Sequence, residues 1–371
     1  MKPVSSNLIA GALFIVAMLA VLLCIQIKHE LPRERKERGT SDAMSALNDW
    51  SRARAYPNID IPPDTYFKEY VASKSRTKEL KRGAFSADTW RPIGPLNSDS
   101  HGRSISVAVN PINPNTIYCG TASGGLWRSH RANQGGDWQR VTLGFPALGI
   151  GSITIDPADS NIMYLGTGEV HRYGGAVGGL VVRTTRGSYG VGILKTIDGG
   201  TTWTKSLDWT YNQQRGVQQV RINPKNNNTL YAATTEGVYK STDHGDNWAQ
   251  VLNIVMATDV VINSTDTTLL LAACGNFKSP GYGIYRSSDA GATWALIPGG
   301  QSNYSGKTRL EAFAGNPYTV YASVADSTTG AGGLWRSTNF GSTWTLINSS
   351  LIFGVQGWYS HFVAVHAIDS A

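Results

Sequence analysis

The sequence is poor in cysteine and has no region in which one sign of charge dominates. Its three cysteines, Cys24, Cys119 and Cys274, are too few for a disulfide-based scaffold in a chain of 371 residues. The 33 lysines and arginines outnumber the 26 acidic residues, which gives a net charge of +7. Because this excess is spread along the chain without a basic stripe, nucleic-acid binding is not expected.

Sequence signatures of several enzyme classes are also missing. The chain contains no glycine-rich phosphate loop, no nucleophile elbow and no zinc signature. Glu169 and His171 have the spacing of two metal ligands, but a third ligand does not accompany them. We therefore predict that the protein uses no metal and no cofactor.

The chain does contain a repeated nine-residue pattern that ends in tryptophan. Each copy has a basic residue first, aspartate or asparagine fourth and glycine sixth, and consecutive tryptophans are 45, 46 and 50 residues apart. Repeats of about this length, made of short strands and turns, are typical of propeller blades. The four copies are KTIDGGTTW (195–203), KSTDHGDNW (240–248), RSSDAGATW (286–294) and RSTNFGSTW (336–344).

Short strand-like segments precede the pattern in every repeat. In the first repeat, where the pattern itself is degenerate, these segments are Ser106–Val109, Thr116–Thr121 and Leu126–Arg128, separated by turn residues. The nine-residue pattern then joins the third segment to a fourth. Four antiparallel strands per repeat make one blade, so we predict an all-β fold, a β-propeller of four-stranded blades.

The recurring positions of the pattern have structural roles in this interpretation. The aspartate or asparagine accepts hydrogen bonds from backbone N–H groups in the turn between the third and fourth strands. The tryptophan is large enough to pack one blade against the next. The residues assigned to these roles are Asp198, Trp203, Asp243, Trp248, Asp289, Trp294, Asn339 and Trp344.

The nine-residue pattern resembles the Asp-box, also called the bacterial neuraminidase repeat. Asp-boxes occur in sialidases, in xyloglucan-cleaving hydrolases, in sortilin-type receptors and in a photosystem assembly factor. The resemblance covers residues 89–371 and implies a β-propeller, closest in kind to sortilin-like and secreted bacterial repeat proteins. It says little about function, because the box lies in the outer hairpin of a blade.

The repeats predict five complete blades and an unfinished sixth. Residues Thr89–Ile93 match a fourth strand of the kind that closes the last blade of a ring, and residues 357–370 match the first strand and turn of a sixth blade. We therefore predict that the propeller, residues 89–371, is a truncated part of a larger ring. A natural open arc is the alternative, and it would leave strand edges exposed.

The N-terminal segment is strongly apolar. Residues 8–27 are long enough to cross a bilayer as a helix, so we predict a single-pass membrane protein with an extracytoplasmic propeller. If residues 1–28 are instead a cleaved signal segment, the protein is secreted. The basic residues after the apolar run favour the opposite orientation. Residues 29–88 are predicted to be a helical linker, with one helix from Asp64 to about Arg82.

Polar and aromatic residues cluster in segments that the propeller pattern places around its mouth. The largest segment is an insertion, residues 166–192, between the second and third strands of the second blade. The linker that follows the same blade contributes further residues, and His101 and Arg103 precede the first blade. The ligand-binding candidates are Glu169, His171, Arg172, Arg183, Arg186, Trp209, Tyr211, Trp358, Tyr359 and His361.

Two interpretations of this cluster stay open. In the first, arginines clamp an acidic group while aromatic rings stack on a sugar or a peptide. In the second, Glu169 pairs with Arg172 or Arg183 and only orders the insertion.

The favoured function is non-catalytic binding of a protein, peptide or glycan at the mouth, as in sortilin-like receptors. The alternative is a sialidase- or xyloglucanase-like glycoside hydrolase, in which Glu169 and Asp208 are the two carboxylates that flank the scissile bond. Neither the arginine motif of sialidases nor the early aspartate of xyloglucanases is recognisable in this sequence. A third possibility is a truncated gene fragment without activity.

Overall fold

The structure is a computed structural model of the chain. It describes residues 53–58, 62, 64–80, 102–132, 137–174, 182–185, 188–210, 214–276, 279–298, 306–326, 331–352 and 357–366. The chain divides into two compact units, residues 1–62 and 63–371, and the second contains helix α3 (Thr65–Leu80) and five four-stranded sheets. Every strand pair in these sheets is antiparallel, so the predicted all-β fold of four-stranded repeats is confirmed.

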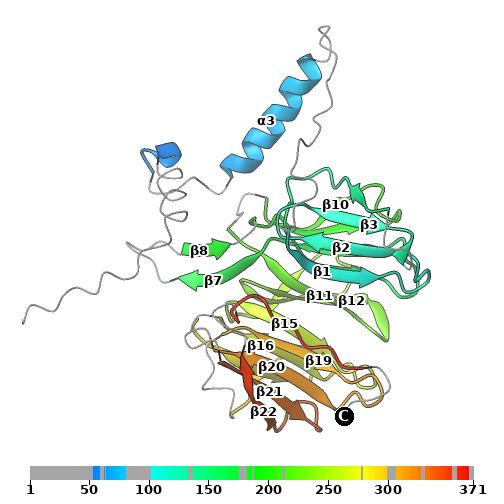
Figure 1. The fold of residues 1–371 in the computed structure, drawn as a ribbon, viewed down its shortest axis with the longest axis vertical. Coiled ribbons are helices and arrows are strands. Elements are labelled where there is room, and N and C mark those ends of the chain that lie inside the picture. Colours follow the sequence, from blue (N-terminus) through cyan, green and yellow to red (C-terminus); the bar gives the residue numbers. More distant parts are fainter. Residues whose placement is uncertain are drawn as a thin grey trace, which may run out of the picture. The chain divides into compact units, whose positions relative to one another are not determined.

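Each sheet corresponds to one repeat of the sequence, and the sheets are numbered here as blades one to five (Figure 1). The first blade contains β1 (Ser104–Val109), β2 (Ile117–Thr121), β3 (Leu126–Ser129) and β4 (Gln139–Val141). The second contains β5 (Ile150–Ile155), β6 (Met163–Thr167), β9 (Gly192–Thr196) and β10 (Thr204–Asp208). The third contains β11 (Val217–Asn223), β12 (Asn226–Thr234), β13 (Gly237–Ser241) and β14 (Ala249–Leu252).

The last two blades follow the same order. The fourth contains β15 (Ala257–Ile262), β16 (Leu270–Cys274), β17 (Gly283–Ser287) and β18 (Ala295–Leu296). The fifth contains β19 (Thr308–Ala312), β20 (Val320–Ala325), β21 (Ala331–Ser337) and β22 (Thr345–Ile352). The insertion of the second blade forms a separate hairpin of β7 (Val170–Gly174) and β8 (Val182–Thr185), between the blade's second and third strands as predicted.

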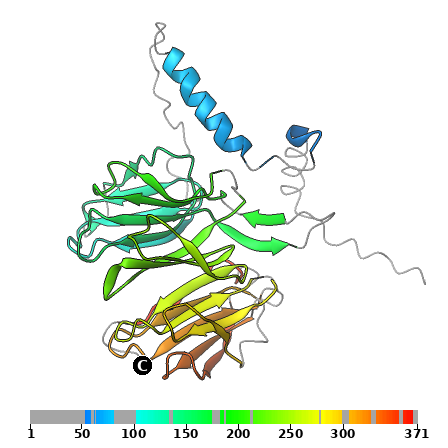
Figure 2. The same ribbon diagram turned by 180° about the vertical axis from the view of Figure 1, so that it is seen from behind.

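Successive blades meet through the first strand of each. The strand β1 contacts β5, β5 contacts β11, β11 contacts β15, and β15 contacts β19. Figure 2 shows the same succession of sheets from behind, from cyan through green to orange. This is the arrangement of propeller blades, with the first strand of each blade innermost and the fourth outermost.

The turn between the third and fourth strands is held by the fourth residue of the nine-residue pattern. In the third blade, Asp243 Oδ1 accepts hydrogen bonds from Asn247 N at 2.9 Å and from Ser241 Oγ at 2.8 Å. The same pair of contacts recurs in blades two, four and five. The side chain thus accepts hydrogen bonds from a backbone N–H group and a hydroxyl group at the two ends of the tight turn. The residues that make these contacts are Asp198, Asp243, Asp289 and Asn339.

The same turn lies against the preceding blade. Gly245 has a φ of 78°, in the left-handed region that favours glycine, and an added Cβ would lie 2.9 Å from Tyr164 Cε1. Tyr164, on β6 of the second blade, donates its hydroxyl to His244 O at 2.7 Å. Trp248 Nε1 donates to Ser206 Oγ of the second blade at 2.9 Å. The turn therefore joins two blades as well as two strands.

A basic residue on the third strand of each blade reaches the turn of the next blade. This contact occurs at all four junctions between the described blades, and the nine-residue pattern alone did not predict it. The contacts are Arg128 Nη1 to Gly199 O at 3.3 Å, Lys195 Nζ to Asp246 Oδ1 at 2.8 Å, Lys240 Nζ to Ala290 O at 2.9 Å and Arg286 Nε to Phe340 O at 3.0 Å.

The apolar core lies between blades. Four clusters of buried side chains each draw on two successive sheets. The tryptophan that ends each nine-residue pattern belongs to the cluster shared with the preceding blade. Burial of one large apolar side chain contributes about 1.5–3 kcal/mol, so these clusters are the main source of stability between blades. The four tryptophans are Trp203, Trp248, Trp294 and Trp344.

The helix α3 occupies the position predicted for the helix from Asp64 to about Arg82. Tyr70 Oη and Lys74 Nζ both donate to Gly144 O, at 3.0 and 3.2 Å, in the loop after β4. No helix within the described residues is long and apolar enough to cross a membrane. The predicted anchor, residues 8–27, and the predicted closing strand, Thr89–Ile93, lie outside the described residues, and both stay predictions.

The predicted inner strand of a sixth blade is not formed in the part of residues 357–370 that the structure describes. Residues 357–360 make a turn, and residues 361–366 follow without regular secondary structure. Side chains of the fourth and fifth blades form hydrogen bonds with this segment, in place of the backbone ladder that a strand would need.

We expect Gly245→Ala to destabilise the fold more than Gly144→Ala. Both glycines are left-handed, with φ of 78° and 75°, so each alanine costs about 1–2 kcal/mol from the backbone alone. Only at Gly245 would the new methyl group also meet Tyr164, because nothing lies within 4 Å of a Cβ at Gly144. Urea unfolding measures the two free energies. Equal losses would show that the turn does not pack tightly against the preceding blade.

Candidate functional site

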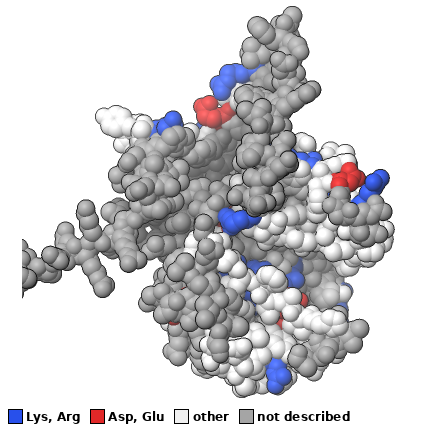
Figure 3. Space-filling view, viewed as in Figure 1, with Lys and Arg blue, Asp and Glu red and all other residues white. Residues whose placement is uncertain are grey.

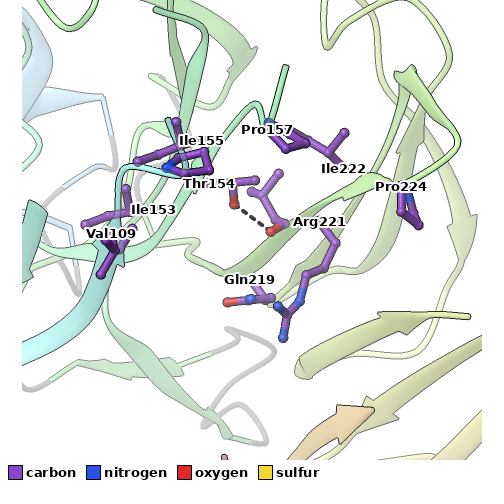
Figure 4. Close-up of a pocket in the computed structure, with 12 residues that line it drawn as sticks. Val109, Ile153, Thr154, Ile155, Pro157, Gln219, Arg221, Ile222 and Pro224 are labelled. Carbon is purple, nitrogen blue, oxygen red and sulfur yellow. Dashed lines mark hydrogen bonds between the residues drawn. The ribbon is translucent and has the colours of Figure 1, made fainter. Parts of the chain in front are cut away.

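Two cavities lie near the innermost strands. The first has a volume of about 310 Å³, lies between blades one to three and is lined mainly by aliphatic side chains and prolines (Figure 4). Thr154 Oγ1 donates to Val220 O across it at 2.6 Å. Among the described residues that line it, Arg221 is the only charged one. We call this the apolar pocket, and it offers few groups that could orient a ligand.

The second cavity has a volume of about 340 Å³ and is lined by charged and aromatic side chains. We call it the central pocket, because four blades and residues 359–362 contribute to its walls. Its size is at the lower end of ordinary ligand sites. Figure 3 shows lysines and arginines at scattered positions on one face of the molecule. The charged and imidazole side chains that line it are Arg103, Glu169, His171, Lys307, Arg309 and His361.

Glu169 provides the carboxylate of the central pocket and is 3% exposed. Arg103 donates two hydrogen bonds to it, from Nη1 to Oε1 at 2.5 Å and from Nη2 to Oε2 at 2.6 Å. His171 Nε2 donates to Oε1 at 3.0 Å. Burial alone would raise the pKa of Glu169, but the hydrogen bonds from His171 and Arg103 outweigh it and lower the pKa to about 2. The carboxylate is therefore ionised at neutral pH and fixed in orientation.

A second buried ionisable group, Lys307, directly precedes β19 and is 8% exposed. Its ammonium donates to Tyr359 O at 3.2 Å, and no ion pair involves it within the described part of the chain. Burial, followed by the nearby charge of Arg309, lowers the pKa of Lys307 to about 7. Lys307 therefore changes its charge close to neutral pH.

The neighbouring innermost strands β11, β15 and β19 carry side chains of opposite charge that pair with one another. Asp259 is 1% exposed and lies 3.3 Å from Arg309 Nε and 3.9 Å from Arg221 Nη2. Arg221 Nη2 also lies 3.4 Å from Glu311 Oε2. Burial raises the pKa of Glu311 even though Arg221 acts against it. These ion pairs link three blades along their innermost edges.

Residues 358 and 359 pack beside Glu169 through aromatic contacts. The ring of His171 lies 5.4 Å from that of Trp358 and 5.7 Å from that of Tyr359, and Arg103 lies over the Tyr359 ring at 5.3 Å. Asn276 Nδ2 donates to His171 O at 2.8 Å and to Trp358 O at 2.7 Å. Asn276 therefore ties this segment to the hairpin of the second blade.

His361 is held as a neutral imidazole in the wall of the pocket. Its Nε2 is 3.0 Å from Lys307 O, and its Nδ1 is 3.0 Å from Ser323 Oγ. A carbonyl oxygen can only accept, so Nε2 carries the proton and Nδ1 accepts from the hydroxyl. Burial lowers the pKa of His361 to about 3, which agrees with a neutral ring at physiological pH.

The structure brings four of the predicted ligand-binding residues close to Glu169. It places Trp209 and the predicted second carboxylate, Asp208, elsewhere. Asp208 ends β10, the outermost strand of the second blade, where Lys205 Nζ and Thr210 N donate to its carboxylate at 2.5 and 2.9 Å. It does not line the central pocket. Trp209 is 7% exposed and packs in the core between blades two and three, so its ring is not available to a ligand. Three of the four, His171, Tyr359 and His361, line the pocket, and Trp358 packs against the ring of His171.

The remaining candidates cannot be placed from the described residues. Arg172 and Arg183 lie on the paired strands β7 and β8, of whose side chains from residue 172 onward nothing is described. Arg186 and Tyr211 lie outside the described residues. The arginine that pairs with Glu169 in the structure is Arg103.

Sequence reasoning missed the contribution of β19 to this pocket. Lys307, Arg309 and Glu311 alternate with Thr308 and Leu310, a period of two that points charged side chains to one face of an innermost strand. This alternation is the signal that could have identified Lys307 and Arg309.

Glu169 and Glu311 should affect acid stability in opposite directions. The pKa of Glu169 is lowered, so its contribution to the free energy of unfolding is present above about pH 4.5 and is lost as the pH falls towards 2. The pKa of Glu311 is raised, so its contribution is present below about pH 4.5 and is lost as the pH rises.

Urea unfolding between about pH 2 and pH 6 tests this difference. The stability advantage of the wild type over Glu169→Gln should shrink as the pH falls, and its advantage over the matched variant Glu311→Gln should grow. The same trend for both variants would contradict the assigned environments.

Comparisons with known proteins place these features in context. No family model matches the chain. The chain is similar to a xyloglucanase of Paenibacillus sp, with 23% identity over 67% of this chain and 26% of the relative, and to one of Hypocrea jecorina, with 24% identity over 68% and 33%. It thus spans about a quarter to a third of these relatives. A solved structure of an ancestral GH74 enzyme matches 71% of this chain and 34% of its own, with 17% identity and a TM-score of 0.51, and supports the propeller fold.

These relatives correct the function predicted from the sequence. The favoured prediction, a non-catalytic and sortilin-like binding propeller, is wrong, because the curated proteins that match the chain are xyloglucanases. The alternative, a glycoside hydrolase, is the interpretation that the comparisons favour.

Proposed function

We propose that this chain forms part of a glycoside hydrolase that acts on a plant-type β-glucan such as xyloglucan, and that the central pocket binds the sugar. The observation that carries the proposal is the ionised Glu169 carboxylate, fixed by Arg103 and His171 inside a cavity. Beside it, the ring of Tyr359 gives an apolar surface on which a pyranose can lie. The xyloglucanase relatives supply the class of substrate.

The two carboxylates of a glycosidase have different protonation states. One acts as an ionised nucleophile or base, and the other is a protonated acid with a raised pKa. The low pKa of Glu169 suits the first role. Among the described lining residues of the central pocket it is the only carboxylate, and Asp208 is held on an outermost strand. An acid for hydrolysis would therefore come from outside the described lining of this pocket, and the role proposed for this chain is substrate binding with Glu169 as one reacting group.

We also infer that the four nine-residue turns are Asp-boxes. Their support is the acceptor geometry at Asp243 and its three counterparts, together with the glycine in the left-handed conformation two residues later. Their role is architectural, because these side chains lie between the third and fourth strands and do not line the central pocket.

Binding of a xyloglucan heptasaccharide to the full chain, measured by isothermal titration calorimetry, tests the proposal. Replacing a group that contacts the sugar through charged hydrogen bonds costs about 1.5–3 kcal/mol, so Glu169→Gln should weaken binding at least about tenfold. Asp208→Asn, on the same blade but away from the pocket, should leave the affinity unchanged.

Loss of Glu169 leaves Arg103 without its carboxylate, so the folding of each variant is checked by a thermal melt. Tyr359→Leu keeps every charge of the pocket and should still weaken binding, because it removes the ring beside the sugar. The proposal fails if the wild type binds no oligosaccharide, or if Asp208→Asn weakens binding as much as Glu169→Gln.

A further inference from the structure

The charges around the central pocket do not balance. Three carboxylates lie along the pocket and the adjoining innermost strands, and each is paired with an arginine at 3.4 Å or less. Lys307 is a fourth cation in the same region and has no carboxylate partner among the described residues. The pairs are Arg103 with Glu169, Arg309 with Asp259 and Arg221 with Glu311.

The ammonium of Lys307 is both buried and incompletely bonded. It has three N–H donors, and its one hydrogen bond to the described residues is to Tyr359 O. The residue is 8% exposed and lines the cavity, so acceptors for its remaining donors would have to lie in the cavity. A buried charge without a counter-ion is costly, and a ligand of opposite charge would remove that cost.

We infer that the central pocket binds a sugar that carries a single negative charge, and that its anionic group lies on the ammonium of Lys307. The inference rests on the proposed function, since the ligand is taken to be a glycan. One unpaired cation matches one monoanionic group, which is the carboxylate of a uronic acid or a sulfate ester. A phosphate monoester, with nearly two charges, would leave the pocket with an excess of negative charge.

The other groups around Lys307 allow an anion to enter. Arg309 and Asp259 neutralise each other, Glu169 is neutralised by Arg103, and His361 is a neutral ring. The closest partner of the ammonium is a carbonyl, which does not compete with an anion for its charge. Binding of an anion stabilises the protonated lysine, so the ligand should bring a proton with it above neutral pH.

Isothermal titration calorimetry at pH 8 in two buffers of different ionisation enthalpy tests this inference on the full chain. The ligands are a neutral β-1,4-glucan tetrasaccharide, the same tetrasaccharide with a terminal glucuronate, and one with a sulfate ester. With the pKa of free Lys307 at about 7, we expect an uptake of about 0.9 proton per acidic ligand. At least one of the two acidic tetrasaccharides should bind at least tenfold more tightly than the neutral one. Whichever of the glucuronate and the sulfate ester binds more tightly identifies the anionic group that the site prefers.

Lys307→Met should abolish both the preference for an acidic ligand and the proton uptake. It removes a buried charge and keeps the side-chain volume, so its melting temperature should not fall; Lys307→Gln provides a second, polar variant. The matched control is Lys225→Met, at an exposed turn outside the pocket.

The outcomes separate the inference from the proposed function. Equal affinity for acidic and neutral tetrasaccharides, or a preference that survives in Lys307→Met, overturns the inference and leaves the glycan site in place. If no tetrasaccharide binds, the proposed function fails. Binding of free glucuronate with proton uptake that depends on Lys307 would then still support the anion site, and its absence would overturn that as well.

Discussion

The position of each blade depends on one repeated contact, in which a basic side chain on a third strand reaches the turn of the next blade. Lys240 illustrates it, because its ammonium lies on Ala290 O while Tyr231 Oη donates to the same carbonyl at 2.8 Å. The turn can receive these donors because Asp289 holds its backbone in place. The contact adds direction to the apolar packing between blades, which by itself would allow neighbouring sheets to slide.

Fixed blades bring the beginnings of the innermost strands together, and that is where the charged side chains gather. Arg103 comes from the first blade, Glu169 from the second, and Lys307 from the fifth. Residues more than 200 positions apart in the sequence thus share one cavity of about 340 Å³. The blades form the rigid frame, while the innermost strands and the segment from β6 to β7 carry the reactive side chains, a division common among folds that serve many functions.

The sequence predicted the fold well and the site in part, for reasons that particular residues make clear. Glycine, aspartate and tryptophan act locally, so the turn around Asp243 could be located from nine residues. The arginine that pairs with Glu169 could not, because Arg103 lies 66 positions away and becomes a neighbour only when two blades pack. Trp209 was misplaced for a similar reason, since no local pattern distinguishes a ring in the core between blades from one at the mouth.

A crystal structure of the full chain with a bound xyloglucan oligosaccharide would show whether the central pocket holds the sugar. We expect sugar density in the central pocket, with a hydroxyl group on Glu169 and a pyranose face against Tyr359. Density confined to the apolar pocket beside Ile153 and Ile222, or on an outermost strand near Asp208, would contradict it.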